Sequence, residues 1–178
     1  MPQETLDIKI ATAKQIVAFN LADEEYGVDI IQVQEIVRPP EITRIPQMAD
    51  FIEGVINLRG KIIPVIDLRK RFKIPERSRS DKTRIVVADA SGQTIGLVVD
   101  GVSEVLRISD DSVDSIPPSI SSIDTEYLTG VAKQAGERLI ILLDLKKILT
   151  ELEKAAVSGL SSDDTAGNRG GEKTQPQN

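Results

Sequence analysis

The chain of 178 residues contains no histidine, no cysteine and no tryptophan. Without imidazole and thiolate groups it cannot form a Cys/His zinc site, a disulfide, a Ser-His-Asp triad or a phosphohistidine. Any catalysis would have to depend on carboxylates, lysine, tyrosine or serine alone. The lack of cysteine also fits a reducing compartment such as the cytosol.

Long apolar segments are missing as well. No run approaches the roughly 20 apolar residues of a membrane-spanning helix, and the acidic N-terminus lacks the apolar core of a signal peptide. The composition, 40% hydrophobic and 28% charged, is typical of a soluble globular protein. We therefore expect a cytoplasmic protein that does not insert directly into a membrane.

Basic residues are outnumbered overall, 22 against 28 acidic ones, but are concentrated in one stretch. The net charge of −6 disfavours nucleic acid as a partner. Between Arg59 and Arg84, however, ten basic residues face three acidic ones, a local charge of +7. This stretch fits either a solvated linker and helix face or a docking surface for an acidic partner. Its only aromatic residue is Phe72, which offers little for stacking on bases.

The sequence repeats itself once, with an offset that grows along the chain. The matched pairs are 27–37 with 96–106 (offset 69), 45–46 with 116–117 (offset 71), 51–55 with 127–131 (offset 76) and 66–68 with 143–145 (offset 77). A growing offset is what loop insertions between two copies of one module would produce. Two copies are too few for a solenoid, so we expect two similar subdomains packed together.

Each copy has the pattern of short β-strands. Residues 17–21 and 84–88 open the copies with alternating or β-branched apolar residues, and a hairpin is expected around Arg59-Gly60. About five strands per copy is typical of a small, partly closed barrel. We therefore expect an all-β protein with short helices, built from two five-stranded SH3-like barrels that share an apolar core. Pro64 lacks an N–H and should lie on an edge or at a bulge.

Helices are expected to be short and late in the chain. Asp144 can cap a helix over 145–157 that would end near Ser158-Gly159, and Asp67 can cap a short turn. The polar composition of 158–178 predicts a disordered tail. The predicted domain therefore covers 1–157, with two intertwined subdomains at about 14–80 and 81–152.

No arrangement of residues predicts catalysis. The segment from Gly54 to Ile62 has five residues between its glycines and no Ser or Thr after Lys61, so it is not a phosphate-binding loop. Asp110 to Asp114 lacks the glycine and glutamate of a calcium loop. We expect no enzyme activity, no cofactor and no metal.

Four segments resemble a known family: Val33–Ile36, Gly54–Leu68, Val98–Val102 and Tyr127–Gly130. The N-L-R-G hairpin followed by I-P-V-I-D-L-R is the most specific of them. Over roughly residues 14–152 the chain resembles the CheW coupling proteins of bacterial chemotaxis. The resemblance implies two barrels with a shared core, in agreement with the internal repeat.

The resemblance also implies a function without catalysis. The family links the cytoplasmic tips of chemoreceptors (methyl-accepting chemotaxis proteins) to the regulatory domain of the histidine kinase CheA. Such an adaptor would be a monomer in isolation, recruited to membrane-associated receptor arrays. Carried onto this sequence, the receptor-binding residues would be Val33, Glu35, Gly54, Asn57, Arg59, Gly60, Val98 and Val99.

Alternatives remain at this point. The chain could be a detached CheW-like regulatory domain of a chemotaxis kinase, or a β-barrel nucleic-acid-binding module that uses the basic stretch. From the residues alone, Arg59 fits a solvated turn as well as a partner contact. Glu35 recurs as Glu104, which favours a structural role. The valines proposed for the receptor surface could equally be interior.

Overall fold

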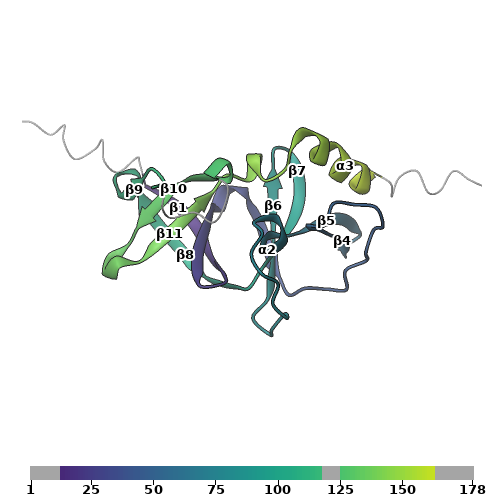
Figure 1. Ribbon diagram of the computed structural model, residues 1–178, viewed down its shortest axis with the longest axis horizontal. Coiled ribbons are helices and arrows are strands. Elements are labelled where there is room, and N and C mark those ends of the chain that lie inside the picture. The colour runs from purple at the N-terminus through teal and green to yellow at the C-terminus, as the bar shows by residue number, and fades with distance from the viewer. Residues whose placement is uncertain (1–12, 118–124, 163–178) are drawn as a thin grey trace, which may run out of the picture.

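The computed structural model describes residues 13–117 and 125–162, which form two β-sheets arranged along the long axis of the molecule (Figure 1). We call the six-stranded sheet, in the order β8-β1-β2-β11-β10-β9, sheet A, and the five-stranded sheet, in the order β3-β6-β7-β5-β4, sheet B. The prediction of an all-β fold is confirmed. The strands are β1 (Ala13–Leu21), β2 (Glu24–Asp29), β3 (Val33–Val37), β4 (Ile52–Leu58), β5 (Lys61–Asp67), β6 (Arg84–Ala90), β7 (Gln93–Val99), β8 (Gly101–Ser109), β9 (Val113–Asp114), β10 (Leu128–Lys133) and β11 (Leu139–Leu143).

The two sequence copies do not correspond to the two sheets. The first copy supplies β1 and β2 to sheet A and β3, β4 and β5 to sheet B, while the second supplies β6 and β7 to sheet B and the rest to sheet A. Sheet B is thus the continuous stretch 33–99, and it separates the two parts of sheet A, 13–29 and 101–143. The predicted intertwined subdomains, at about 14–80 and 81–152, remain a prediction about the sequence copies, whereas the sheets divide the chain at 33–99 and at 13–29 with 101–143. Sheet A also gains a sixth strand, β9, beyond the predicted five.

The strand order nevertheless preserves the repeat. Strands β8-β1-β2-β11-β10 of sheet A correspond one by one to β3-β6-β7-β5-β4 of sheet B. Gly27 and Gly96 illustrate the equivalence, since a Cβ on either would approach the side chain of Ile16 or Ile85, respectively, to 2.8 Å. Positions in the two sheets can therefore be compared residue by residue.

Three apolar clusters lie within the part of the chain that the structure describes. The largest is shared between the sheets, and it joins Val17 and Phe19 of β1 to Ile66 of β5 and Val86 of β6. Two smaller clusters lie inside the individual sheets, one around Ile16 in sheet A and one around Ile85 and other residues of sheet B. Alternate residues of one strand thus face different cores. The predicted shared apolar core is confirmed.

Asp100 lies where the chain crosses from sheet B to sheet A. Its carboxylate accepts hydrogen bonds from Nε of Arg69 at 2.8 Å and from the backbone N–H of Ala22 at 2.8 Å, and it also forms an ion pair with Nη2 of Arg69. Arg69 is nearly buried, and its Nη1 donates to the carbonyl of Pro75 at 2.6 Å. One carboxylate therefore ties the short helix after β5 to the turn between β1 and β2.

We expect Asp100→Asn to lower the free energy of unfolding by about 2 kcal/mol at neutral pH, because a charge-assisted hydrogen-bond network is lost. Burial alone would raise the pKa of Asp100, but Arg69 and the amide of Ala22 outweigh it, so the pKa is lowered. An unfolded Asp titrates near ~3.9, so this stabilisation is complete above that pH and is lost as the pH falls through the lower folded pKa. Urea unfolding of both proteins at neutral pH and at about pH 3 measures the difference, which should shrink with acid. A difference that stays constant would contradict this account.

The helices begin and end differently from the prediction. Asp67 caps α2 (Leu68–Arg71) as expected, accepting from the N–H of Arg69 at 2.9 Å. Asp144, in contrast, caps only a 3-10 turn, and the α-helix α3 starts later. The remaining elements are η1 (Ile30–Gln32), η2 (Asp110–Ser112), η3 (Thr125–Tyr127), η4 (Ala135–Glu137), η5 (Leu145–Lys147) and α3 (Glu151–Ser162).

A second start signal explains the shift of the last helix. Oγ1 of Thr150 accepts from the N–H of Glu153 at 3.2 Å, and Oε1 of Glu153 accepts from the N–H of Thr150 at 3.1 Å, which is a capping box. The helix then passes through Gly159, and its Val157 is buried in the shared core. The predicted helix over 145–157 and the tail starting at 158 are therefore wrong in their bounds. Of the predicted tail, 163–178 lies outside the described residues.

Candidate functional site

The hairpin between β4 and β5 presents Arg59. Leu58 pairs with Lys61, so the loop consists of Arg59 and Gly60 alone, with φ values of 54° and 83°. Two positive φ angles define a type I′ turn, which matches the twist of the flanking strands. Oδ1 of Asn57 accepts from the N–H of Gly60 at 2.9 Å and closes the turn. The predicted hairpin is confirmed, and it leaves the Arg59 side chain 80% exposed.

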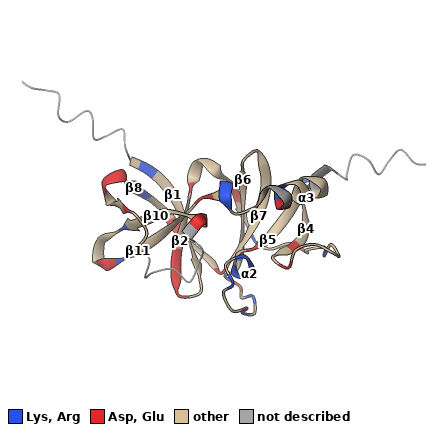
Figure 2. Ribbon diagram, turned by 45° about the horizontal axis from the view of Figure 1, so that its top comes forward, with Lys and Arg blue, Asp and Glu red and all other residues tan. Residues whose placement is uncertain are grey.

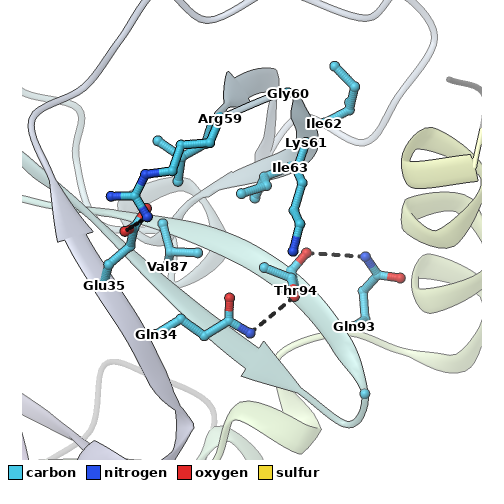
Figure 3. Close-up of a pocket in the computed structure, with 12 residues that line it drawn as sticks. Gln34, Glu35, Arg59, Gly60, Lys61, Ile62, Ile63, Val87, Gln93 and Thr94 are labelled. Atoms are coloured by element: carbon cyan, nitrogen blue, oxygen red, sulfur yellow. Dashed lines mark hydrogen bonds and ion pairs between the residues drawn. The ribbon is translucent and has the colours of Figure 1, made fainter.

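Arg59 reaches across the end of sheet B to Glu35. Its Nη1 lies 2.9 Å from Oε2 of Glu35, which stands on β3 (Figure 3). Strand β3 is one edge of the sheet and β4 is the other. The ion pair therefore links the turn after one edge strand to the strand at the opposite edge.

An open groove of about 610 Å³ lies beside this ion pair (Figure 3). Its floor is apolar and buried, formed by Ile63 and Val87, and its rim is polar. On the rim, Nε2 of Gln34 donates to Oγ1 of Thr94 at 3.2 Å. The lining residues are Gln34, Glu35, Leu58, Arg59, Gly60, Lys61, Ile62, Ile63, Val87, Gly92, Gln93 and Thr94.

Pro64 explains why the sheet opens at this point. In sheet A the equivalent strands β11 and β2 are paired from Ile140 opposite Glu25 to Leu142 opposite Gly27. In sheet B the pairing of β5 with β7 begins only at Val65, directly after Pro64. Proline has no N–H to donate to the ladder, and it occupies the position of Ile141 in the other copy. The prediction that Pro64 lies on an edge or at a bulge is wrong, because β5 is an inner strand between β7 and β4, and the bulge in its pairing with β4 lies between Ile52 and Gly54.

The structure divides the other predicted site residues. Val33 is half-buried and packs against the shared core. Val98 and Val99 are 8% and 1% exposed, the first inside sheet B and the second in the shared core, and neither lines the groove beside Arg59. Gly54 is buried beneath the crossing segment at Thr43. Of the predicted site residues, the structure thus brings together Glu35, Arg59 and the residues of the turn, Asn57 and Gly60.

Sequence reasoning missed much of the groove. Gln34, Lys61, Ile63, Val87 and Thr94 were not predicted, although Lys61 lies next to the predicted turn. The available signal was Pro64 itself, because a proline inside a strand pattern marks a point where neighbouring strands separate.

Comparison with known proteins gives the family. A family model described as the CheW-like domain matches residues 15–153. The chain belongs to the CheW family. It is 41% identical over 148 residues to the chemotaxis protein CheW of Klebsiella aerogenes, covering 83% of this chain and 89% of that protein. It is 32% identical over 141 residues to the CheW of Bacillus subtilis, covering 79% and 90%.

A solved CheW structure agrees with the fold. The crystal structure of the scaffolding protein TtCheW from Thermoanaerobacter tengcongensis matches with a TM-score of 0.72 and 47% sequence identity. The match covers 77% of this chain and 88% of that one. Within residues 13–117 and 125–162, none of the helices has the length and apolar character required to cross a membrane.

Proposed function

We propose that this CheW-family chain is a cytoplasmic adaptor without catalytic activity that couples chemoreceptor cytoplasmic tips to the regulatory domain of the kinase CheA. In this proposal the groove beside Arg59 binds the receptor, and the kinase domain binds at a separate sheet edge. The observation that supports it most is the exposed Arg59 at the groove mouth, held by the turn and by Glu35.

The groove has the features of a binding hot spot. Arginine is enriched at such positions because its planar group forms several directed hydrogen bonds. The 2.9 Å pair with Glu35 involves one N–H group of Arg59, so its other donors remain for a partner. The buried floor at Ile63 and Val87 fixes the shape against which a partner would pack.

The nucleic-acid alternative is not favoured by the ion pairs. Figure 2 places basic residues along α2, but Lys70 contacts Glu53 at 2.8 Å and Arg71 contacts Glu153 at 3.0 Å. Their charges are thus balanced inside the molecule. Five of the ten basic residues between Arg59 and Arg84 have carboxylate partners in the described structure: Arg59, Arg69, Lys70, Arg71 and Arg79.

Arg59→Ala tests the proposal. Because the side chain is exposed and its ion pair is solvated, the free energy of unfolding should change by no more than ~0.5 kcal/mol. Receptor affinity should fall more than about tenfold, the effect of losing ~1.4 kcal/mol or more at a hot spot. Isothermal titration against a chemoreceptor tip fragment and, separately, the CheA regulatory domain measures both affinities, and the kinase affinity should persist.

Arg107→Ala provides the matched control, since Arg107 is an exposed arginine of sheet A, outside the groove. It should bind the receptor tip fragment as the wild type does. Unchanged receptor affinity in Arg59→Ala would make Arg59 an ordinary solvated residue. An equal loss of affinity for both partners, together with a lower melting temperature, would mean that Arg59 supports the fold instead.

A further inference from the structure

The hairpin between β10 and β11 and its counterpart between β4 and β5 lie beside different sets of charged residues. In sheet A the N–H of Gln134 donates to the carbonyl of Arg138 at 2.8 Å and closes the hairpin between β10 and β11. The equivalent closing pair in sheet B is Leu58 with Lys61. At the repeat offset of 77, Arg138 is therefore the counterpart of Lys61.

In sheet A one cation holds two carboxylates. Arg138 donates from Nε and Nη2 to Glu25 at 2.6 and 2.7 Å, and from Nη1 to Glu104 at 2.7 Å. The hydrogen bonds from Arg138 lower the pKa of Glu25, so this carboxyl is charged at neutral pH. Glu25 lies on β2, Glu104 on β8, and Arg138 directly before β11. The three charged groups therefore pair with one another within the chain.

In sheet B the cations outnumber the carboxylates at the equivalent place. Glu35, the counterpart of Glu104, is paired with Arg59, which is an additional cation in the turn. The counterpart of Glu25, at the offset of 69, is Thr94, which carries no charge. Lys61 is exposed, and its side-chain ammonium forms no hydrogen bond or ion pair with the residues that the structure describes. Two cations thus face one carboxylate at this groove.

The space left by the missing carboxylate opens onto the groove. Figure 3 shows the Lys61 side chain directed toward Thr94, and both line the groove. The Thr94 hydroxyl accepts from Gln34, so its own proton remains to be donated to a ligand. Pro64 keeps β5 unpaired from β7 here, whereas in sheet A the corresponding strands are paired up to Glu25.

We propose that the partner of this groove inserts an aspartate or glutamate side chain between Lys61 and Thr94, in the position that Glu25 occupies beside Arg138. The inference rests on the proposed function, which makes this partner a chemoreceptor tip. A single carboxylate fits the site because Arg59, Lys61 and Glu35 together leave one positive charge. It would gain a charge-assisted hydrogen bond from Lys61 and a second bond from the Thr94 hydroxyl.

Thr94→Glu tests the inference by supplying the carboxylate from the chain itself. The introduced carboxyl should pair with Lys61 as Glu25 pairs with Arg138, and the melting temperature should stay the same or rise. Affinity for a chemoreceptor tip fragment should fall more than tenfold, because the introduced carboxylate neutralises Lys61 and repels the carboxylate of the ligand. Thr94→Gln introduces a side chain of nearly the same shape as that of Thr94→Glu but without the charge. It should retain an affinity within about threefold of that of the wild type.

A mutant cycle gives a second readout. Lys61→Ala should lower the affinity for the wild-type tip fragment at least fivefold. When each acidic residue of the fragment is replaced by alanine in turn, one replacement should cause no further loss in combination with Lys61→Ala. Purified proteins and titration calorimetry at two salt concentrations suffice, since the Lys61 contribution should diminish with salt.

The outcomes separate the two proposals. If wild-type protein does not bind the tip fragment, both the proposed function and this inference are contradicted. If the wild type binds, Arg59→Ala weakens binding and Thr94→Glu binds normally, the receptor groove stands and the carboxylate inference is overturned. Equal losses in Thr94→Glu and Thr94→Gln, or additivity for every acidic residue of the fragment, would also overturn it.

Discussion

Cutting the chain between residues 80 and 81 should leave two fragments that are each unfolded in isolation, whereas the intact chain unfolds in one cooperative transition. The cut separates β1 and β2 from their sheet A partners and β3, β4 and β5 from their sheet B partners. Both halves also lose part of the shared core, in which Phe19 packs with residues of β6 and β7. Each fragment holds only about 80 to 100 residues, a size at which an incomplete core stabilises very little.

Circular dichroism and calorimetry of the separate and mixed fragments measure this. Each fragment alone should lack a thermal transition, and mixing them should restore β-structure, because every strand then finds its partner. The intact chain should show equal calorimetric and van't Hoff enthalpies. Two resolved transitions in the intact chain, or a folded fragment 1–80, would show that the sheets are independent.

Gly54→Ala should reduce the free energy of unfolding by at least about 3 kcal/mol, through a backbone clash combined with strain. Gly54 has a φ of 146°, and a Cβ there would lie 2.0 Å from the carbonyl oxygen of Thr43. Thr43 and Val55 exchange two backbone hydrogen bonds of 2.9 Å at this crossing, so neither segment can move aside without losing them.

Gly60→Ala is the matched control, because Gly60 also has a positive φ, 83°, but a Cβ on this residue would meet nothing within 4 Å. Only the left-handed backbone penalty applies there, about 1 kcal/mol. Urea unfolding of both variants gives the comparison. Equal effects would mean that the crossing at Thr43 adjusts easily and that Gly54 is needed only for its backbone angle.

Local elements followed closely from the sequence. Strand positions, the turn at Arg59-Gly60 and the cap at Asp67 depend on neighbouring residues, and each is where the pattern predicted it. The late helix failed for a local reason too, since two caps compete there and the box formed by Thr150 and Glu153 starts the α-helix.

Long-range features could not be predicted in the same way. A strand pattern does not specify which strand lies alongside, so the repeat was assigned one barrel per copy although each sheet uses both copies. The same limit applies to Val98 and Val99, because alternation tells which residues share a face but not what covers it. Predicting the groove would have required a comparison of the two copies, with Pro64 set against Ile141 and Thr94 against Glu25. The structural meaning of these differences is clear only once the strand order is known.

The division of each sheet between the two copies has a consequence for the origin of the fold. A chain with a single copy would hold two strands of one barrel and three of another, and it could complete neither by itself. Two such chains could complete both by exchanging these parts, as an intertwined two-fold dimer. Joining them into one polypeptide removes the symmetry requirement, so that the arginine at one hairpin can pair with two carboxylates of its own sheet, whereas the other sheet has the uncharged Thr94 in place of one of them.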